Sequence, residues 1–144
     1  MYDVTPITTG RAFDCGPACL QMLLSYYGIE ADFDELRQEC DTGLSGCSMA
    51  KLKEVATAHG LEDPQAWSMD AAELMRQDRP AIVWWKYNHY VVFCGLDEKG
   101  DVVICNPSRG RYPIDQGSFA ALITGVKPGQ GAVLFNGEPH DLPE

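Results

Sequence analysis

The chain has 144 residues, 45% of them hydrophobic and 22% charged, and a formal net charge of −10 at pH 7. This size and mix suit one globular domain over 1–144, with its core at about 9–135 and a loosely held tail at 136–144. The negative charge disfavours nucleic acid and anionic lipid surfaces as partners. No stretch nears the roughly 18 apolar residues of a membrane span, and no export signal is present, so we expect a cytoplasmic protein without direct membrane insertion.

The six cysteines raise the alternatives of a disulfide framework and a zinc site. Without an export signal the thiols are expected to stay reduced, so each cysteine is interpreted by itself. The sequence contains no Cys-x-x-Cys pair, so its spacing gives little support to zinc. We expect no metal and no organic cofactor.

The segment FDCGPACLQMLLSYYG carries apolar residues at helical spacing. It predicts a mostly buried helix from about Cys15 to Tyr27. Asp14 suits the N-cap, Pro17 suits the first turn, and Gly28 suits the C-terminal end. The helix start therefore falls at Cys15.

Three more helices are predicted before Pro80. They cover Asp34 to Cys40, Met49 to Ala58 with Ser48 as cap and Gly60 as stop, and a segment that starts near Asp70 and ends before Pro80. Asp70 and Glu73 have the spacing of a capping box. The first half is thus expected to be helical.

The second half is rich in β-branched and aromatic residues, in the runs AIVWWKY, HYVVFCGL, DVVICN and GAVLF. These runs predict strands, DEKG predicts a hairpin turn, and SFAALI predicts a short helix. The expected class is α+β, with a helical N-terminal half packed on an antiparallel sheet from the C-terminal half.

Cys15, His89 and Asn106 could form a catalytic set. A helix N-terminus favours the thiolate, so Cys15 is a candidate nucleophile. His89 opens a predicted strand and could act as general acid and base, while Asn106 ends the next strand and could orient the imidazole. A hairpin about DEKG would bring His89 and Asn106 to the same end.

The other cysteines and histidines have simpler interpretations. Inert burial is the usual role of an intracellular cysteine, and Cys19, Cys94 and Cys105 lie among apolar residues. His59 suits a helix C-terminus, and His140 lies in the tail. None of these five residues is a candidate catalytic residue.

Several runs, in order and spacing, resemble the bacteriocin-processing double-glycine leader peptidase family of the papain-like cysteine peptidase superfamily. They are DCGPACLQMLLSYYG, SMAKLKEVATAHGL, RPAIVWWKYNHYVVF, VVICNPSRGRYPI and FAALITGV. The likeness extends from about Thr9 to Phe135. It implies the papain-like fold and thiol protease activity.

By this resemblance Cys15 is the nucleophile and His89 the catalytic histidine. Most relatives have aspartate where this chain has Asn106, and papain itself uses asparagine. A glutamine that completes the oxyanion hole is replaced by Thr9, and such a donor is typically worth ~3 kcal/mol. The Thr9 hydroxyl or the Arg11 guanidinium could take its place.

The resemblance also implies a substrate and a partner. The substrate would be a precursor peptide whose amphipathic leader ends in Gly-Gly or Gly-Ala, and the partner an ABC exporter. Trp85 and Tyr87 share strand parity with His89 and are candidates for the wall of a narrow cleft, with core packing as the alternative. Trp84 has the opposite parity and is expected in the core.

Three functions are therefore open. The first is a leader-cleaving cysteine peptidase. The second is a catalytically weak or inactive peptide-binding domain of the same fold, suggested by Thr9. The third is another thiol acyl-transfer enzyme, such as an amidase or a transglutaminase-like protein.

Overall fold

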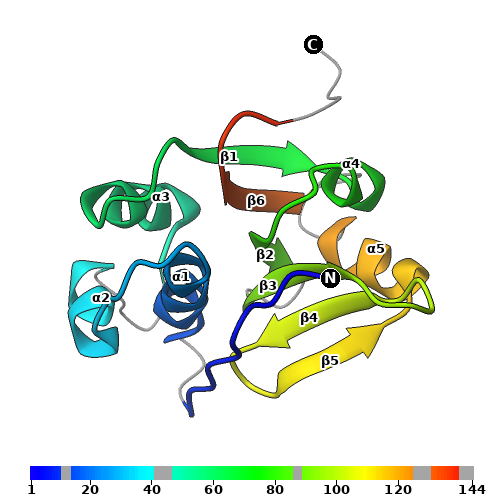
Figure 1. Cartoon of the computed structure of the whole chain (residues 1–144), viewed down its shortest axis with the longest axis horizontal. Helices are drawn as coiled ribbons and strands as arrows, with labels where there is room; N and C mark the ends of the chain where they lie inside the picture. The colour runs from blue at the N-terminus through cyan, green and yellow to red at the C-terminus, as the bar shows by residue number, and fades with distance from the viewer. Residues whose placement is uncertain (11–13, 41–46, 86–88, 125–130, 140–144) are drawn as a thin grey trace.

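The computed structural model describes residues 1–10, 14–40, 47–85, 89–124 and 131–139. Within these ranges five helices and six strands follow one another (Figure 1). The helices are α1 (Cys15–Tyr26), α2 (Phe33–Glu39), α3 (Met49–Ala58), α4 (Ala71–Met75) and α5 (Gln116–Thr124). The strands are β1 (Pro64–Met69), β2 (Ala81–Trp85), β3 (His89–Leu96), β4 (Val102–Asn106), β5 (Gly110–Ile114) and β6 (Gly131–Asn136).

The helix α1 ends within a residue of the prediction. The backbone N–H of Ile29 donates to the carbonyl of Leu24 at 2.9 Å, and that of Gly28 donates to the carbonyl of Ser25 at 3.0 Å. Gly28 has φ +78°, which completes a Schellman motif that glycine adopts without strain. Asp14 occupies the predicted N-cap position, but its side chain makes no capping hydrogen bond to the first turn.

The predicted caps of α3 and α4 are confirmed. Ser48 Oγ accepts a hydrogen bond from the N–H of Lys51 at 3.1 Å. Asp70 and Glu73 form a capping box, with reciprocal hydrogen bonds of 2.8 and 3.1 Å. The starts of α3 and α4 could therefore be predicted from their capping residues alone.

All strand pairs of the sheet are antiparallel, in the order β1-β6-β2-β3-β4-β5. The predicted α+β class, with a helical N-terminal half and an antiparallel sheet, is confirmed. The prediction missed β1, which comes from the first half, and β5. Both are edge strands that contain proline, Pro64 and Pro113, and carry polar residues, so their sequences lack an apolar strand pattern.

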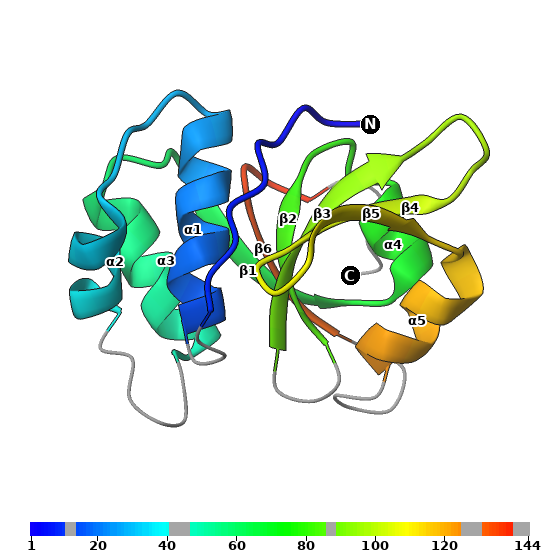
Figure 2. The same ribbon diagram turned by 90° about the horizontal axis from the view of Figure 1, so that it is seen from below.

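The sheet is covered on both faces (Figure 2). Side chains of β3 alternate between the two cores: Tyr90 and Val92 pack in the cluster with α1 and α3, while Val91 and Phe93 pack in the cluster with α4 and α5. Phe93 and Phe119 of α5 stack with centroids 5.8 Å apart. The middle strands are therefore buried on both sides and form a rigid support for residues at their ends.

No disulfide joins any of the six cysteines, which all lie in the described residues and are buried. Cys19, Cys94 and Cys105 are fully buried in the cluster with α1, as expected for inert thiols. In the part of the chain that the structure describes, no helix has the length and apolar character to cross a bilayer, and no group of three or more side chains could hold a metal ion.

Candidate active site

Cys15 lies at the N-terminus of α1 and is only 5% exposed. The next residue, Gly16, packs closely: a Cβ built on it would lie 3.4 Å from Cys47 Cβ and 3.5 Å from Tyr90 Cδ2. The Tyr90 hydroxyl donates to the carbonyl of Cys47 at 2.8 Å. Tyr90 therefore ties the start of α1 and the segment before α3 to the start of β3.

The pKa of the Cys15 thiol is raised, mainly by burial. The carboxylate of Asp14 raises this pKa further. Three backbone N–H groups act in the opposite direction, those of Tyr90, Gly16 and Cys15 itself. Proximity to the helix start therefore favours the thiolate as predicted, but burial outweighs it.

His89 and Asn106 meet at one end of the sheet. His89 Nε2 lies 2.8 Å from Asn106 Oδ1. Asn106 Oδ1 also accepts a hydrogen bond from the backbone N–H of Ser108 at 2.9 Å, and Asn106 Nδ2 donates to the Tyr112 hydroxyl at 2.9 Å. The predicted proximity of His89 and Asn106 across the β3–β4 hairpin is thus observed.

Tyr90 connects the surroundings of Cys15 with the strand that His89 opens. Tyr90 directly follows His89 in β3, and its backbone N–H is the group that most lowers the pKa of the Cys15 thiol. The structure therefore brings the start of α1 beside the start of β3, where the imidazole is located.

The two tryptophans of β2 lie on opposite faces of the sheet. Trp85 pairs with His89 in the strand register, and their ring centroids are 6.2 Å apart. Trp85 is only 6% exposed and belongs to the cluster with α5, which favours packing over a cleft wall. Trp84 is half-buried against the cluster with α1. Tyr87 lies outside the described residues.

Thr9 is located beside the strand end that carries Asn106. Its backbone N–H donates to the carbonyl of Pro107 at 2.8 Å, and the residue is half-buried. Arg11, the other candidate for an oxyanion donor, lies outside the described residues. Thr9 therefore lies near Asn106, at the end of the site that also carries His89.

The sequence analysis missed Tyr90, Ser108 and Tyr112. Tyr90 was seen only as a strand residue, and Tyr112 lies in a strand that was not predicted. The β4–β5 hairpin brings Tyr112 back to Asn106, so its contact depends on the pairing of β5 with β4. No local sequence signal identifies such a contact.

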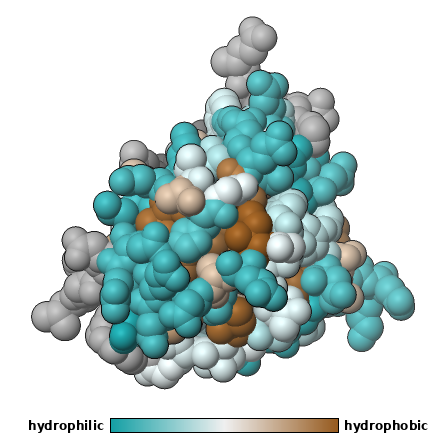
Figure 3. Space-filling view, turned by 60° about the vertical axis from the view of Figure 1, so that its left-hand side comes forward, coloured by the Kyte–Doolittle hydropathy of each residue, from teal (hydrophilic) through white to brown (hydrophobic). Residues whose placement is uncertain are grey.

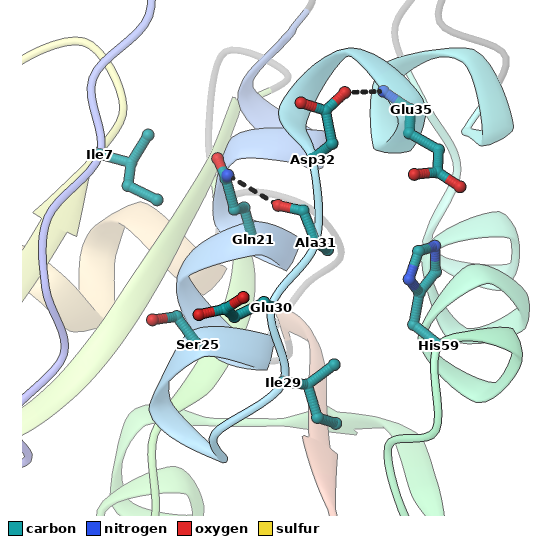
Figure 4. Close-up of a pocket in the computed structure, with 9 residues that line it drawn as sticks. All are labelled: Ile7, Gln21, Ser25, Ile29, Glu30, Ala31, Asp32, Glu35 and His59. Carbon is teal, nitrogen blue, oxygen red and sulfur yellow. Dashed lines mark hydrogen bonds between the residues drawn. The ribbon is translucent and has the colours of Figure 1, made fainter.

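A pocket of about 620 Å³ is lined by side chains of α1 and of the segment that joins α1 to α2 (Figure 4). Gln21 and Ser25 line it and lie roughly 9 and 15 Å along the helix from Cys15. The other lining residues are Ile7, Ile29, Glu30, Ala31, Asp32, Glu35 and His59. On this side of the molecule hydrophobic patches are set in a mostly hydrophilic surface (Figure 3).

His59 caps α3 as predicted and also lines this pocket. Its Nε2 atom lies 2.8 Å from Glu39 Oε1. Because its partner is a carboxylate of α2, His59 connects two helices and is separate from the His89 site.

Comparisons with known proteins agree with this architecture. The sequence model of the Peptidase C39 family matches residues 4–127. The crystal structure of a double glycine motif protease from an AMS/PCAT transporter, in complex with the leader peptide, is similar with a TM-score of 0.82 and 26% identity, over 92% of this chain and 91% of that one. The peptidase domain of Streptococcus ComA has the same fold, with a TM-score of 0.75 and 20% identity over 95% and 100% of the two chains.

Three relatives are similar to this chain in sequence, two of them much longer proteins and one of comparable length. The colicin V secretion/processing ATP-binding protein CvaB of Escherichia coli is 28% identical over 78% of this chain and 16% of its own length. The lactococcin-G-processing and transport ATP-binding protein LagD of Lactococcus lactis is 32% identical over 78% and 17%. The chain thus spans about a sixth of these transport proteins, whereas an uncharacterized protein of Methanothermobacter thermautotrophicus matches it at 30% identity over 85% of each chain.

Proposed function

This chain belongs to the Peptidase C39 family, and we propose that it is a cysteine peptidase that cleaves precursor peptides after a Gly-Gly or Gly-Ala leader motif. The observation that carries the proposal is the 2.8 Å contact of His89 with Asn106, in a fold where the backbone N–H of Tyr90, the residue after His89, reaches the thiol of Cys15 at the start of α1. Nucleophile, base and orienting group are the parts that thiol acyl transfer needs.

In this mechanism the Cys15 sulfur attacks the carbonyl carbon of the second small residue. His89 takes the thiol proton and later gives a proton to the leaving amine, so the C–N bond breaks and a thioester forms. Water then attacks the thioester and His89 accepts its proton. The C–S bond breaks, the leader leaves with a free carboxyl group, and His89 returns the proton to the sulfur. Asn106 holds the imidazole through Nε2 during both steps.

The raised pKa of Cys15 gives His89 a specific task. Because burial favours the neutral thiol, the proton must be removed as the substrate binds or reacts, and His89 is the proposed base for this step. The backbone N–H of Cys15 and the Thr9 hydroxyl are the proposed donors to the oxyanion. The proposed preference for two small residues before the cleaved bond implies a cleft at Cys15 too narrow for larger side chains.

The same proposal includes a leader and an exporter as partners. The similar structure with 26% identity was solved in complex with a leader peptide, and CvaB and LagD are named as secretion or transport proteins. We therefore propose a precursor with an amphipathic leader as substrate, an ABC exporter as partner, and the cytoplasm as the place of cleavage.

The first experiment is mass spectrometry of double-glycine precursor peptides incubated with the protein under reducing conditions. Cys15→Ala should abolish cleavage, and Cys19→Ala is the matched control because Cys19 is a buried thiol one turn further along α1. Cleavage after the second glycine by the wild type and Cys19→Ala alone supports the proposal. Equal cleavage by Cys15→Ala would refute it.

A second candidate function is a peptide-binding domain of low or no activity. It is favoured by one observation, the threonine at position 9 where the resembled family has glutamine. Intact peptides that bind the wild type and Cys15→Ala with equal affinity, measured by calorimetry, would support this candidate over the peptidase.

A further inference from the structure

Asn106 is held at both ends of its side-chain amide. Oδ1 accepts from the backbone N–H of Ser108 at 2.9 Å, and Nδ2 donates to the Tyr112 hydroxyl at 2.9 Å. We propose that Tyr112 is a positioning residue that, with the Ser108 N–H, fixes the orientation of the Asn106 amide and so decides which nitrogen of His89 carries the proton. This inference rests on the proposed function, because it concerns the base of the same reaction.

An asparagine amide has two different ends of nearly equal shape. Rotation by 180° exchanges an acceptor for a donor without changing the packing. Ser108 offers a backbone N–H, which can only donate, so Oδ1 must face it. The Tyr112 hydroxyl can accept, so it satisfies Nδ2 in the same orientation. The two contacts together select one of the two orientations.

The orientation of the amide determines the tautomer of His89. Oδ1 can only accept, so His89 must carry its proton on Nε2 to bond with it at 2.8 Å. In neutral imidazole this leaves the lone pair on Nδ1, which can take a proton from a thiol. A rotated amide would present Nδ2 to Nε2 and favour the proton on Nδ1. His89 would then be unable to act as a base through Nδ1.

Because Asn106 is buried, its Nδ2 group depends on the Tyr112 hydroxyl as hydrogen-bond acceptor. Asn106 is only 6% exposed, so water is a poor substitute for a lost acceptor. Tyr112 is itself placed by the pairing of β5 with β4, where it lies opposite Ile104. The guanidinium of Arg109 lies over the Tyr112 ring, 4.3 Å from its centroid, in a cation–π contact.

An aspartate at position 106 would not need the Tyr112 hydroxyl to fix its orientation. Both of its terminal atoms are oxygens, so either orientation offers His89 an acceptor. The inference therefore predicts that the Tyr112 hydroxyl controls the His89 tautomer when residue 106 is asparagine and does not control it when residue 106 is aspartate.

The decisive experiment reads the tautomer directly and needs no substrate. Ring ¹⁵N chemical shifts of the histidines are recorded in the Cys15→Ala protein at about pH 9, well above the ordinary histidine pKa of about 6.5. The chain has three histidines, and the signals of His89 are those that disappear in His89→Gln. We expect the proton on Nε2. Adding Tyr112→Phe should populate the form with the proton on Nδ1.

Two matched variants make the result specific. Tyr26→Phe removes the hydroxyl of an exposed tyrosine near the opposite end of α1 and should leave the tautomer unchanged. Asn106→Asp combined with Tyr112→Phe should keep the proton on Nε2. An unchanged tautomer in Tyr112→Phe with Asn106 present would overturn the inference, as would an equal shift in both backgrounds.

Peptide cleavage provides a second readout in the protein with Cys15 present. Tyr112→Phe should lower kcat by roughly 10-fold, in line with other groups that orient a functional imidazole, and leave KM unchanged. A change of KM alone would contradict a positioning role. If the protein cleaves no peptide at all, the proposed peptidase function fails, while the tautomer experiment still decides the role of Tyr112.

Discussion

The nucleophile end and the imidazole end of the candidate site are held in different ways. Around Cys15 the polar contacts come from backbone N–H groups, and the side chains nearby serve to pack. Around His89 the contacts form a chain of side-chain hydrogen bonds through Asn106 to Tyr112. Apart from Cys15 itself, a residue at the first end should therefore tolerate a substitution that keeps the backbone in place. At the second end, the loss of one polar atom should lower activity.

His89→Ala tests the imidazole end and should give the largest effect. Without the general base and acid we expect kcat for peptide cleavage to fall by about 1,000-fold. His59→Ala is the matched control, because His59 pairs with Glu39 beside the pocket on α1 and not with Asn106. Steady-state kinetics on a double-glycine peptide measure both. Equal losses in the two variants would place the base elsewhere.

Thr9→Gln adds the amide that the resembled family has at this position. If oxyanion stabilisation limits the rate, the variant should be at least about 10-fold faster than the wild type, a part of the 100- to 1,000-fold that such a donor contributes elsewhere. Thr8→Gln, at the exposed neighbouring residue, is the control. A rate equal to or below that of the wild type would mean that the chain stabilises the oxyanion by other groups.

The stability of the protein at alkaline pH tests whether the thiols of α1 are buried. Burial raises the pKa of Cys15 and Cys19, and it raises the pKa of Tyr27 to about 12. The unfolded chain ionises its thiols at about pH 8.5, so it releases protons before the folded chain does. The free energy of unfolding should therefore be at its full value below about pH 8 and fall as the pH rises further.

Urea unfolding under reducing conditions at several pH values measures this dependence. Cys19→Ala removes one buried thiol and should make the fall with pH shallower. A stability that rises between about pH 8 and 10 would contradict the burial of these thiols in the folded protein.

Gly16→Ala should give the smallest effect. The added methyl would make contacts of 3.4–3.5 Å with Cys47, Leu52 and Tyr90, which are ordinary packing distances. Alanine also favours a helix over glycine by up to about 1 kcal/mol, so the thermal midpoint should stay equal or rise slightly. Activity should remain near that of the wild type. A large loss of activity with a normal melt would show that the α1 N-terminus depends on the side chain at this position.

The sequence predicted the helices and the central strands well because their signals are local. Caps at Ser48 and Asp70, the glycine after α1 and the β-branched runs act over a few residues. The edge strands β1 and β5 were missed for a physical reason. Their residues are polar or include proline, and they become strands because β6 and β4 offer them hydrogen bonds.

The candidate site was predictable in part. Cys15, His89 and Asn106 were identified from helix capping, strand ends and family resemblance, and the contact between His89 and Asn106 is observed. Tyr112 and Tyr90 were not identified, because their polar contacts join segments separated in the chain. The burial that raises the pKa of Cys15 also depends on packing around α1, which no local pattern reports.

The position of β6 in the sheet has a consequence for synthesis on the ribosome. The strand β6 lies between β1 and β2 and pairs with both, although it follows them by more than 40 residues. While the chain emerges, β2, β3, β4 and β5 can pair in sequence as hairpins, but β1 has no neighbour until residues 131–136 arrive. The apolar edge of β2 stays open for the same period. We therefore expect nascent chains that stop before Gly131 to be recognised by chaperones as incomplete, even though the strands that carry His89 and Asn106 are already made.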